Sequence, residues 1–377
     1  MHSTNVIIIG TTHHNTLGMI RSIGEANVDI SCILLLYGEQ ESYLAQSKYV
    51  NHAYYVDSSD EITDLLLSIK KDTKQILITV TDEAAHQLDI NTKLLEQYYY
   101  FFRSDVIGQL THYMDKYVQD KIAEKIGIDV PNNYDSDNIQ YPCILKPIAS
   151  LLGGKQFLIC NNQNDYTNVL NRHKDVDFQI QQYIKKEKEF VLNGLSVDGE
   201  VYIPACILKH REVLGGTTYS TVYPINLLNP DLIHKSKQLI KAIAYEGLFG
   251  IEYMLSEGKY YFIEINLRND ATSYSVTKAG VNLPLAYIYA KQNKDYLSIL
   301  QNQIKTIDSM VEFRDINFVL NKKINLLKWI KQKNLCECLY FYNKEDFKPY
   351  LINYKLFRKR FITIVFNKLL KCIGRNK

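Results

Sequence analysis

Cysteine is sparse in this 377-residue chain, and its pattern is not that of a disulfide framework. Disulfide-rich domains are short and carry dense, paired cysteines, whereas here they are odd in number and scattered. Cys336 and Cys338 are closer together than the ligands of a zinc knuckle, and no paired histidines follow them. We therefore expect reduced thiols in a cytoplasmic protein. The seven cysteines are Cys32, Cys143, Cys160, Cys206, Cys336, Cys338 and Cys372.

Long apolar runs and an excess of one charge are missing as well. The first apolar run, Val6–Ile9, stops at Gly10 and has no lysine or arginine before it, which is unlike a secretory leader. No stretch approaches the roughly 18 apolar residues of a membrane span. With 44 basic against 41 acidic residues the net charge is only +3, so no global field indicates a nucleic-acid partner.

The N-terminal third alternates predicted strands with predicted helices. Val6–Gly10, Ile30–Tyr37 and Gln75–Val80 have the apolar, β-branched pattern of buried parallel strands. Helical patterns cover 17–23 and 63–69. This order predicts a doubly wound α/β sheet with ligand contacts at the carboxyl ends of its strands.

A dinucleotide fingerprint is absent from that sheet. In the first glycine region, Gly10 to Gly18, Thr12 stands where G-x-G-x-x-G requires its second glycine. A plain turn between strand and helix is the favoured interpretation, and a nicotinamide-dependent oxidoreductase is correspondingly disfavoured. Further on, 141–290 is rich in strand and hairpin patterns, which predicts a second unit of the α+β class.

The most informative pattern is a predicted hairpin turning at 257–259. With a three-residue turn, Ser256 pairs with Tyr260, and counting back along both strands sets Glu252 directly across from Glu264. A two-residue turn would instead shift the register by one and place the two glutamates on opposite faces. The choice of turn therefore decides whether the carboxylates meet.

If Glu252 and Glu264 do meet, their repulsion needs compensation. Two carboxylates with Asn266 are the hard oxygen ligands that Mg²⁺ prefers, and Mg²⁺ leaves its other positions to phosphate oxygens. Arg268 falls on the same face by the strand period of two. The alternative is a solvated hairpin face whose glutamates point at water.

This hairpin, with the elements before it, resembles the ATP-grasp superfamily, in particular its carboxylate–amine ligases and the related carbamoyl-phosphate-synthetase-like and biotin-carboxylase-like ATP-binding domains. The resemblance implies a doubly wound domain at 1–112 and an ATP-grasp domain at 113–305. Within the latter it implies a lid at 113–184 and an antiparallel core at 185–305. A basic C-terminal segment, 306–377, follows.

The resemblance also implies roles for single residues. Lys146 would reach the α- and β-phosphates, the backbone of Ile184 would bind adenine, and Glu189 would bind the ribose. Mg²⁺, with Mn²⁺ as the alternative, would lie on Glu252, Glu264 and Asn266. The residues implied to bind ATP are Lys116, Lys146, Gly153, Gly154, Gln181, Ile184 and Glu189.

Catalytic roles fall to Arg268, Lys209 and Arg211. Arg268 matches the arginine of the family's metal-binding signature and would hold the transferring phosphoryl group or the acyl oxyanion. Lys209 and Arg211 stand beside a Gly/Thr-rich stretch that suits a phosphate or a substrate carboxylate; the alternative is a surface turn with solvated charges.

The implied activity is an ATP-dependent ligation of a small carboxylate to an amine through an acyl phosphate, adding an amino acid in cell-envelope or surface-polysaccharide metabolism. A non-catalytic nucleotide-binding scaffold is the alternative, and a homodimer is an assembly the resemblance allows. Beyond Asp346 the tail is basic and rich in apolar residues. Such a tail can lie on the inner face of an anionic membrane, or it can close over the core with its lysines in water.

Overall fold

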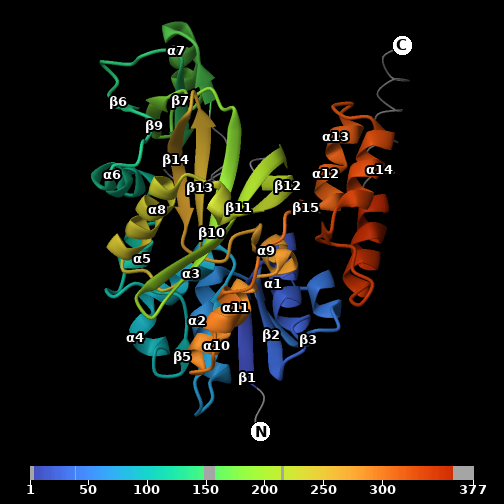
Figure 1. Cartoon of the computed structure of the whole chain (residues 1–377). Helices are drawn as coiled ribbons and strands as arrows, with labels where there is room; N and C mark the ends of the chain where they lie inside the picture. The colour runs from blue at the N-terminus through green and yellow to red at the C-terminus, as the bar shows by residue number, and fades with distance from the viewer. Residues whose placement is uncertain (1–3, 39, 148–157, 214–215, 360–377) are drawn as a thin grey trace.

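The computed structural model describes residues 4–38, 40–147, 158–213 and 216–359, and it is a mixed α/β structure (Figure 1). Strands of the described residues form sheets of five, seven and four strands. None of the helices in this described part combines the length and apolar content that crossing a bilayer requires. The described cysteines are free thiols, as expected.

The five-stranded sheet is parallel, in the order β3-β2-β1-β4-β5. Side chains of β1 alternate between two cores: Val6 and Ile8 join the large one and Ile7 and Ile9 a smaller one, so both faces of the sheet are covered. Its elements are β1 (Thr4–Gly10), α1 (His14–Gly24), β2 (Ile30–Tyr37), β3 (Val50–Val56), α2 (Ile62–Ile69), β4 (Gln75–Thr79), α3 (Asp82–Ile90), α4 (Thr92–Leu95) and β5 (Tyr99–Tyr100).

A four-stranded antiparallel sheet, in the order β6-β9-β7-β8, stands at one end of the molecule (Figure 1). It has a small core of its own that includes Cys143, Cys160 and Tyr166. Short strands and one covering helix suffice because this unit packs only a few apolar side chains. Its elements are β6 (Asn133–Tyr134), β7 (Cys143–Pro147), β8 (Leu158–Cys160), α7 (Gln163–Arg172) and β9 (Phe178–Gln182). Two helices precede this unit in the chain and pack elsewhere: α5 (Gln109–His112) on α3, and α6 (Lys116–Ile126) on residues 230–242 and 259–266.

The seven-stranded sheet runs β14-β13-β10-β11-β12-β15-β16. Its strand β12 contains the Gly/Thr-rich stretch that follows Arg211: alternating Thr218, Ser220 and Val222 face inward. The strands are β10 (Lys188–Val197), β11 (Glu200–Val213), β12 (Gly216–Pro224), β13 (Gly247–Ser256), β14 (Lys259–Asn266), β15 (Ile307–Met310) and β16 (Cys338–Leu339). The helices around it are α8 (Pro230–Ala242), α9 (Ser273–Ala279), α10 (Leu283–Lys291), α11 (Leu297–Leu300), α12 (Glu312–Asp315), α13 (Asn317–Leu320) and α14 (Leu326–Leu335).

The C-terminal part of the described chain is tied to the first helix through Arg21, a fully buried arginine. Its guanidinium contacts Asp346 at 3.1 Å and donates to the carbonyl oxygens of Tyr340 and Phe341 at 2.6 and 3.0 Å. Asp346 also accepts from the hydroxyl of Ser47 and the backbone N–H of Lys48. The chain is therefore closed over the core up to this point, and residues 348–359 continue as a helix.

Replacing Arg21 with alanine should lower the free energy of unfolding by about 3–5 kcal/mol, because Asp346 would be left as a buried charge without a cation. Urea unfolding followed by circular dichroism measures this. Lys241→Ala is the matched control, since it removes an exposed ion pair with Glu200 and should leave the midpoint unchanged. An Arg21 variant as stable as the control would show that the buried pair does not hold the C-terminal segment.

Candidate active site

The two glutamates of the hairpin meet as expected, but the turn differs from the prediction. Glu252 of β13 is the direct cross-strand partner of Glu264 of β14. Ser256 pairs with Lys259 rather than with the residue after it, so a two-residue turn connects the strands. Both turn residues have positive φ, 51° at Glu257 and 76° at Gly258, as tight hairpin turns of the primed type require.

A β-bulge corrects the register. Tyr253 pairs with Phe262 and Glu252 pairs with Glu264, so Ile263 is the additional residue of β14. In a regular two-residue hairpin Ile263 would face Glu252, and Glu264 would point to the other side of the sheet. The carboxylates therefore share a face because of the bulge, and the expectation of a three-residue turn was wrong.

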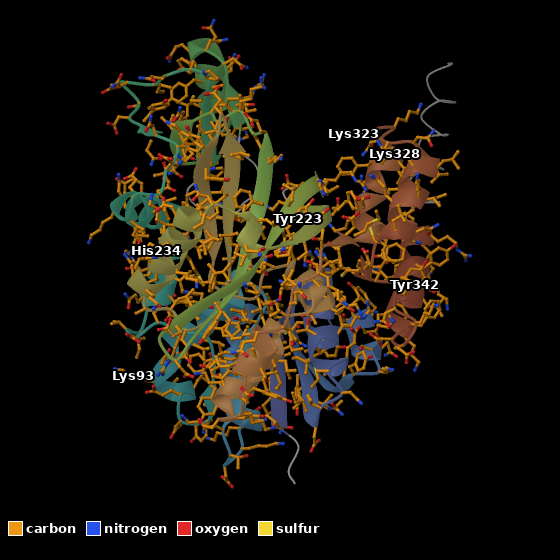
Figure 2. The ribbon with its side chains drawn as sticks, in the orientation of Figure 1. Lys93, Tyr223, His234, Lys323, Lys328 and Tyr342 are labelled. Carbon is orange, nitrogen blue, oxygen red and sulfur yellow. The ribbon has the colours of Figure 1, made fainter. Side chains whose placement is uncertain are left out.

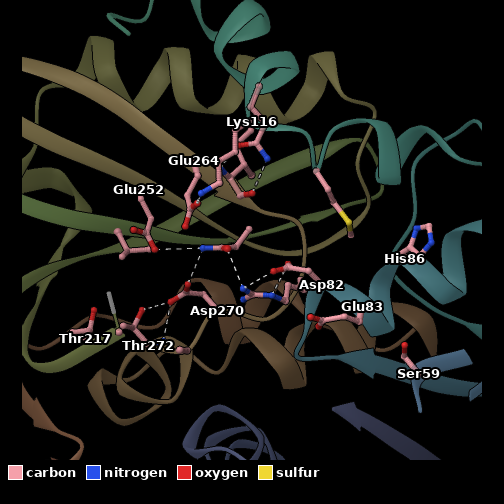
Figure 3. Close-up of a pocket in the computed structure, with 18 of the residues that line it drawn as sticks. Ser59, Asp82, Glu83, His86, Lys116, Thr217, Glu252, Glu264, Asp270 and Thr272 are labelled. Carbon is pink, nitrogen blue, oxygen red and sulfur yellow. Dashed lines mark hydrogen bonds and ion pairs between the residues drawn. The ribbon is translucent and has the colours of Figure 1, made fainter. Parts of the chain in front are cut away.

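A cavity of about 570 Å³ opens in front of this carboxylate pair. On the opposite wall lie Asp82, Glu83 and His86, which come from α3 at the carboxyl end of the parallel sheet (Figure 3). The cavity thus lies between the first sheet and the hairpin. Of the predicted site residues, the following line it: Lys116, Lys209, Glu252, Glu264, Asn266 and Arg268.

Each glutamate has its own lysine. Lys116, at the first turn of α6, approaches Glu264 to 2.9 Å. Burial by itself would raise the pKa of Glu264, but the charge of Lys116 and its hydrogen bond outweigh that effect and lower the pKa to about 2. Glu264 is therefore an anion at every physiological pH.

Glu252 is held differently. Lys209, whose side chain is only 2% exposed, donates to Glu252 at 2.7 Å and to Glu189 at 2.6 Å. Burial raises the pKa of Glu252 to about 7, with further repulsion from Glu264 and Asp270 and with Lys209 acting in the opposite direction. Without a further cation, this carboxylate therefore takes up a proton near neutral pH.

Asn266 and Arg268 connect the hairpin to the first sheet. The Asn266 amide donates weakly to Glu252 and Asp270, at 3.4 and 3.3 Å, and its oxygen accepts from Arg268 at 3.1 Å. Arg268 also binds Asp82 of α3 at 2.8 Å. Asp82 was not among the predicted site residues, although its position just after a parallel strand was the available signal.

Lys146 and Gln181 lie outside the cavity lining, on β7 and β9 of the small sheet. Lys146 donates to the Gln181 oxygen at 2.6 Å, and the Gln181 amide donates to Asp120 at 3.0 Å. Burial, followed by the like charge of Lys116, lowers the pKa of Lys146. No sequence signal singled out Asp120, which is a buried residue of α6.

Ile184 and Glu189 also lie away from the cavity lining. Ile184 is buried just after β9, and Glu189 on β10 contacts Lys186 and Lys209, both at 2.6 Å. Gly153 and Gly154, the glycines implied to close over phosphates, lie outside the described residues. The structure thus gathers the metal candidates and Lys116 at the hairpin, whereas Lys146 and the adenine and ribose candidates lie outside the cavity lining.

Arg211 is the predicted residue whose position disagrees with its expected role. Its guanidinium makes a two-pronged contact with buried Asp315, at 2.7–3.2 Å, and lies 4.2 Å from the centre of the Tyr219 ring. Lys209 and Arg211 are also not neighbours on one face, because β11 has register irregularities between them. Arg211 therefore ties β11 to the C-terminal segment, and it does not line the cavity.

The donor set agrees with Mg²⁺ bound together with a phosphate ligand, and less well with a metal held by protein alone. Among the described residues, no three His, Cys, Asp or Glu side chains are gathered in a way that could hold an ion. Glu252, Glu264 and the Asn266 oxygen offer an incomplete set of hard ligands, as Mg²⁺ commonly has in proteins. Lys146, a partly buried cation without a carboxylate partner among the described side chains, would be compensated by a phosphate.

Comparison with known proteins shows what this fold and site are similar to. The ATP-grasp domain family matches residues 113–272, which include the hairpin and most of the surrounding sheet. This is the family that the sequence resembles. One curated relative is the "Carbamoyl phosphate synthase large chain" of Sulfolobus acidocaldarius, which is 25% identical to this chain over 185 residues. The aligned region covers 43% of this chain and 17% of that protein. The chain thus spans only about a sixth of the relative's length.

Solved structures extend the likeness in fold beyond that domain. A biotin carboxylase domain of Hydrogenobacter thermophilus 2-oxoglutarate carboxylase, in complex with MgADP, ADP and bicarbonate, aligns with a TM-score of 0.64 and 18% identity. That alignment covers 82% of this chain and 74% of the other. L-amino acid ligase from Bacillus licheniformis aligns with a TM-score of 0.60 and 12% identity, over 82% and 80%.

The pKa of Glu252 predicts a pH-dependent stability. A carboxyl group whose pKa is about 7 when folded, against an ordinary 4.5, holds its proton more tightly in the folded chain. Folding therefore loses stability as the pH rises from about 4.5 through about 7, and above that range the loss is complete. Glu264, with a pKa of about 2, is ionised throughout this window.

Glu252→Gln cannot ionise, so between about pH 5 and pH 8 its free energy of unfolding should fall less than that of the wild type, by on the order of 1–3 kcal/mol. Urea unfolding in EDTA across that range measures the difference. Glu200→Gln, from an exposed ion pair, is the control and should follow the wild type. Parallel profiles for wild type and Glu252→Gln would contradict the raised pKa.

Proposed function

We propose that this protein is an ATP-dependent carboxylate–amine ligase. The observation that carries the proposal is the cross-strand pair Glu252–Glu264, which lines a 570 Å³ cavity between two lysines. Two carboxylates kept this close favour a bound divalent cation, and a divalent cation with few protein ligands favours phosphate as its other partner. The matched ATP-grasp domain points to the same chemistry.

In this proposal Glu252, Glu264 and Asn266 hold Mg²⁺, which neutralises phosphate charge when bound. Lys116 and Lys146 bind phosphate oxygens, and the lysine charge that now lowers the pKa of Glu264 is then shared with the nucleotide. The backbone at Ile184 and the carboxylate of Glu189 are proposed to hold adenine and ribose. Lys209 acts as a positioning residue, because it is buried and orients Glu189 and Glu252.

The proposed reaction has two steps. An oxygen of the substrate carboxylate bonds to the γ-phosphorus of ATP while the bond from that phosphorus to the bridging oxygen breaks, giving an acyl phosphate and ADP. The amine nitrogen then bonds to the carbonyl carbon, phosphate leaves, and the amine loses a proton. Arg268, which lies between Asn266 and Asp82, stabilises the charge that develops in these steps; one such donor contributes about 3 kcal/mol.

The substrate is an extension of the same proposal. L-amino acid ligase shares this fold, which favours an amino acid as one of the two reactants. An envelope or surface-polysaccharide precursor is the proposed partner, in keeping with the basic C-terminal segment. The proposed organisation is a doubly wound domain at 1–112, an ATP-grasp domain at 113–305 and a C-terminal segment at 306–377.

ADP release against a panel of amino acids and small carboxylic acids, with Mg²⁺ and ATP, tests this function. A productive pair should stimulate ADP release and yield a product of the summed mass less water. Glu264→Gln should reduce the stimulated rate by about 10²–10³-fold, since it removes a metal ligand but keeps its shape.

Two outcomes would contradict the proposal. One is stimulated turnover that survives in Glu264→Gln at the level of the control Glu200→Gln, whose side chain lies in an exposed ion pair. The other is nucleotide binding without turnover for every pair tested, which would support the non-catalytic scaffold instead.

A further inference from the structure

Charge is divided unevenly along this chain. Residues 317–377 carry 15 of the 44 lysines and arginines but only 3 of the 41 acidic residues, so their formal charge is +12. The other 29 basic and 38 acidic residues lie in 1–316, whose formal charge is −9. A molecule with a net charge of only +3 therefore has a strongly basic end, and such a field attracts an anionic surface.

Part of this basic end is a surface centred on α14. No acidic residue occurs from 316 to 336, a stretch that includes the turn before α14 and the helix itself. Figure 2 shows Lys323 and Lys328 at the outer edge of the C-terminal helices. The lysines of this stretch are Lys322, Lys323, Lys328, Lys331 and Lys333.

Apolar side chains lie exposed among these lysines. Leu326 is 49% exposed, Leu327 76% and Ile330 40%. At 100° per residue these three fall within one arc of about 100° on the helix. Trp329 lies outside that arc and is buried, with its indole N–H donating to Asp315 at 2.8 Å. The helix therefore packs on one side and presents a second apolar side to solvent.

These three apolar residues and four of the lysines around them are called the α14 surface below. Among the side chains that the structure describes, none of the four lysines forms an ion pair; Lys323 only lies over the ring of Phe318, at 5.7 Å. The α14 surface thus combines exposed apolar side chains with lysine charges that no described carboxylate neutralises. Its members are Leu326, Leu327, Ile330, Lys322, Lys323, Lys328 and Lys331.

We propose that the α14 surface docks on an anionic lipid bilayer. The three apolar side chains enter the boundary between headgroups and acyl chains, and the lysines bind lipid phosphates. A nucleic acid would satisfy the lysines but would leave Leu327 and its neighbours exposed, so the combination favours a membrane surface. This inference concerns a partner and does not depend on the proposed ligase reaction.

Docking here would orient the active site relative to the membrane. Asp315 accepts from Trp329 of α14 and also binds Arg211 of β11, so one buried carboxylate joins the helix α14 to the seven-stranded sheet. The same sheet carries the Glu252–Glu264 pair. The active-site cavity would then have a fixed orientation relative to the membrane and to any substrate held there.

Co-sedimentation of the full chain with vesicles tests the docking. One set of vesicles is phosphatidylcholine alone, and the other contains about 30% phosphatidylglycerol. The wild type should bind the anionic vesicles at least about tenfold more tightly, and salt should weaken that binding. Leu327→Gln with Ile330→Gln, and separately Lys323→Glu with Lys328→Glu, should each weaken it about tenfold.

Leu227→Gln is the matched control for the apolar variant. Leu227 is 68% exposed on a short helical turn between β12 and α8, far along the chain from the α14 surface, and this variant should bind like the wild type. Equal thermal midpoints exclude misfolding as the cause of any loss. Since these substitutions lie outside the cavity, ADP release measured without vesicles should be unchanged.

Three outcomes would overturn the inference. Binding that is equal for both vesicle types, or absent, excludes an anionic bilayer. Binding that survives in the α14 variants but is lost in Lys368→Glu with Lys371→Glu assigns the contact to the last residues of the chain instead. A vesicle-free sedimentation profile in which the wild type is a dimer and Leu327→Gln with Ile330→Gln is a monomer identifies a second copy as the occupant.

Discussion

The close approach of two carboxylates on neighbouring strands is the constraint on which the site depends. Glu252 and Glu264 are direct partners, and their repulsion is offset by separate lysines that come from different parts of the chain. The compensation is unequal: the pKa of Glu264 is far below its ordinary value, whereas burial keeps that of Glu252 high. A bound cation would neutralise the part of the carboxylate repulsion that the two lysines leave uncompensated.

Residues directly after the hairpin hold it against the parallel sheet. Arg268, directly after the hairpin, binds Asp82 at the edge of the parallel sheet. Next to it, Asn269 exchanges hydrogen bonds with Asn15 of α1, at 2.6 and 3.0 Å, in a buried contact. The cavity is therefore bounded by two sheets that are joined by hydrogen bonds beside it.

The C-terminal segment contributes structure as well as charge. Buried carboxylates anchor it twice, Asp346 to Arg21 and Asp315 to Arg211, and each of these acids takes several further hydrogen bonds. Arg211 illustrates why a basic residue near a glycine-rich stretch is an ambiguous signal: an arginine can serve a ligand or a buried acid, and only the position of that acid in space decides. The α14 surface has no such partner among the described acids.

Much of the framework was determined by the sequence itself, because apolar periodicity is a local property. The strand Ile30–Tyr37, for example, has the bounds that its pattern predicted. The short strand β5 and the strand β12, with its threonines and serines, lacked that signal.

The pairing of Glu252 with Glu264 was predicted correctly but from a three-residue turn, which was wrong. Only the tertiary structure decided that a two-residue turn and a bulge at Ile263 together produce this pairing. Partners such as Asp82 and Asp120 were decided by tertiary structure too, because an ion pair or hydrogen bond between residues far apart in the chain leaves no periodic pattern in the sequence.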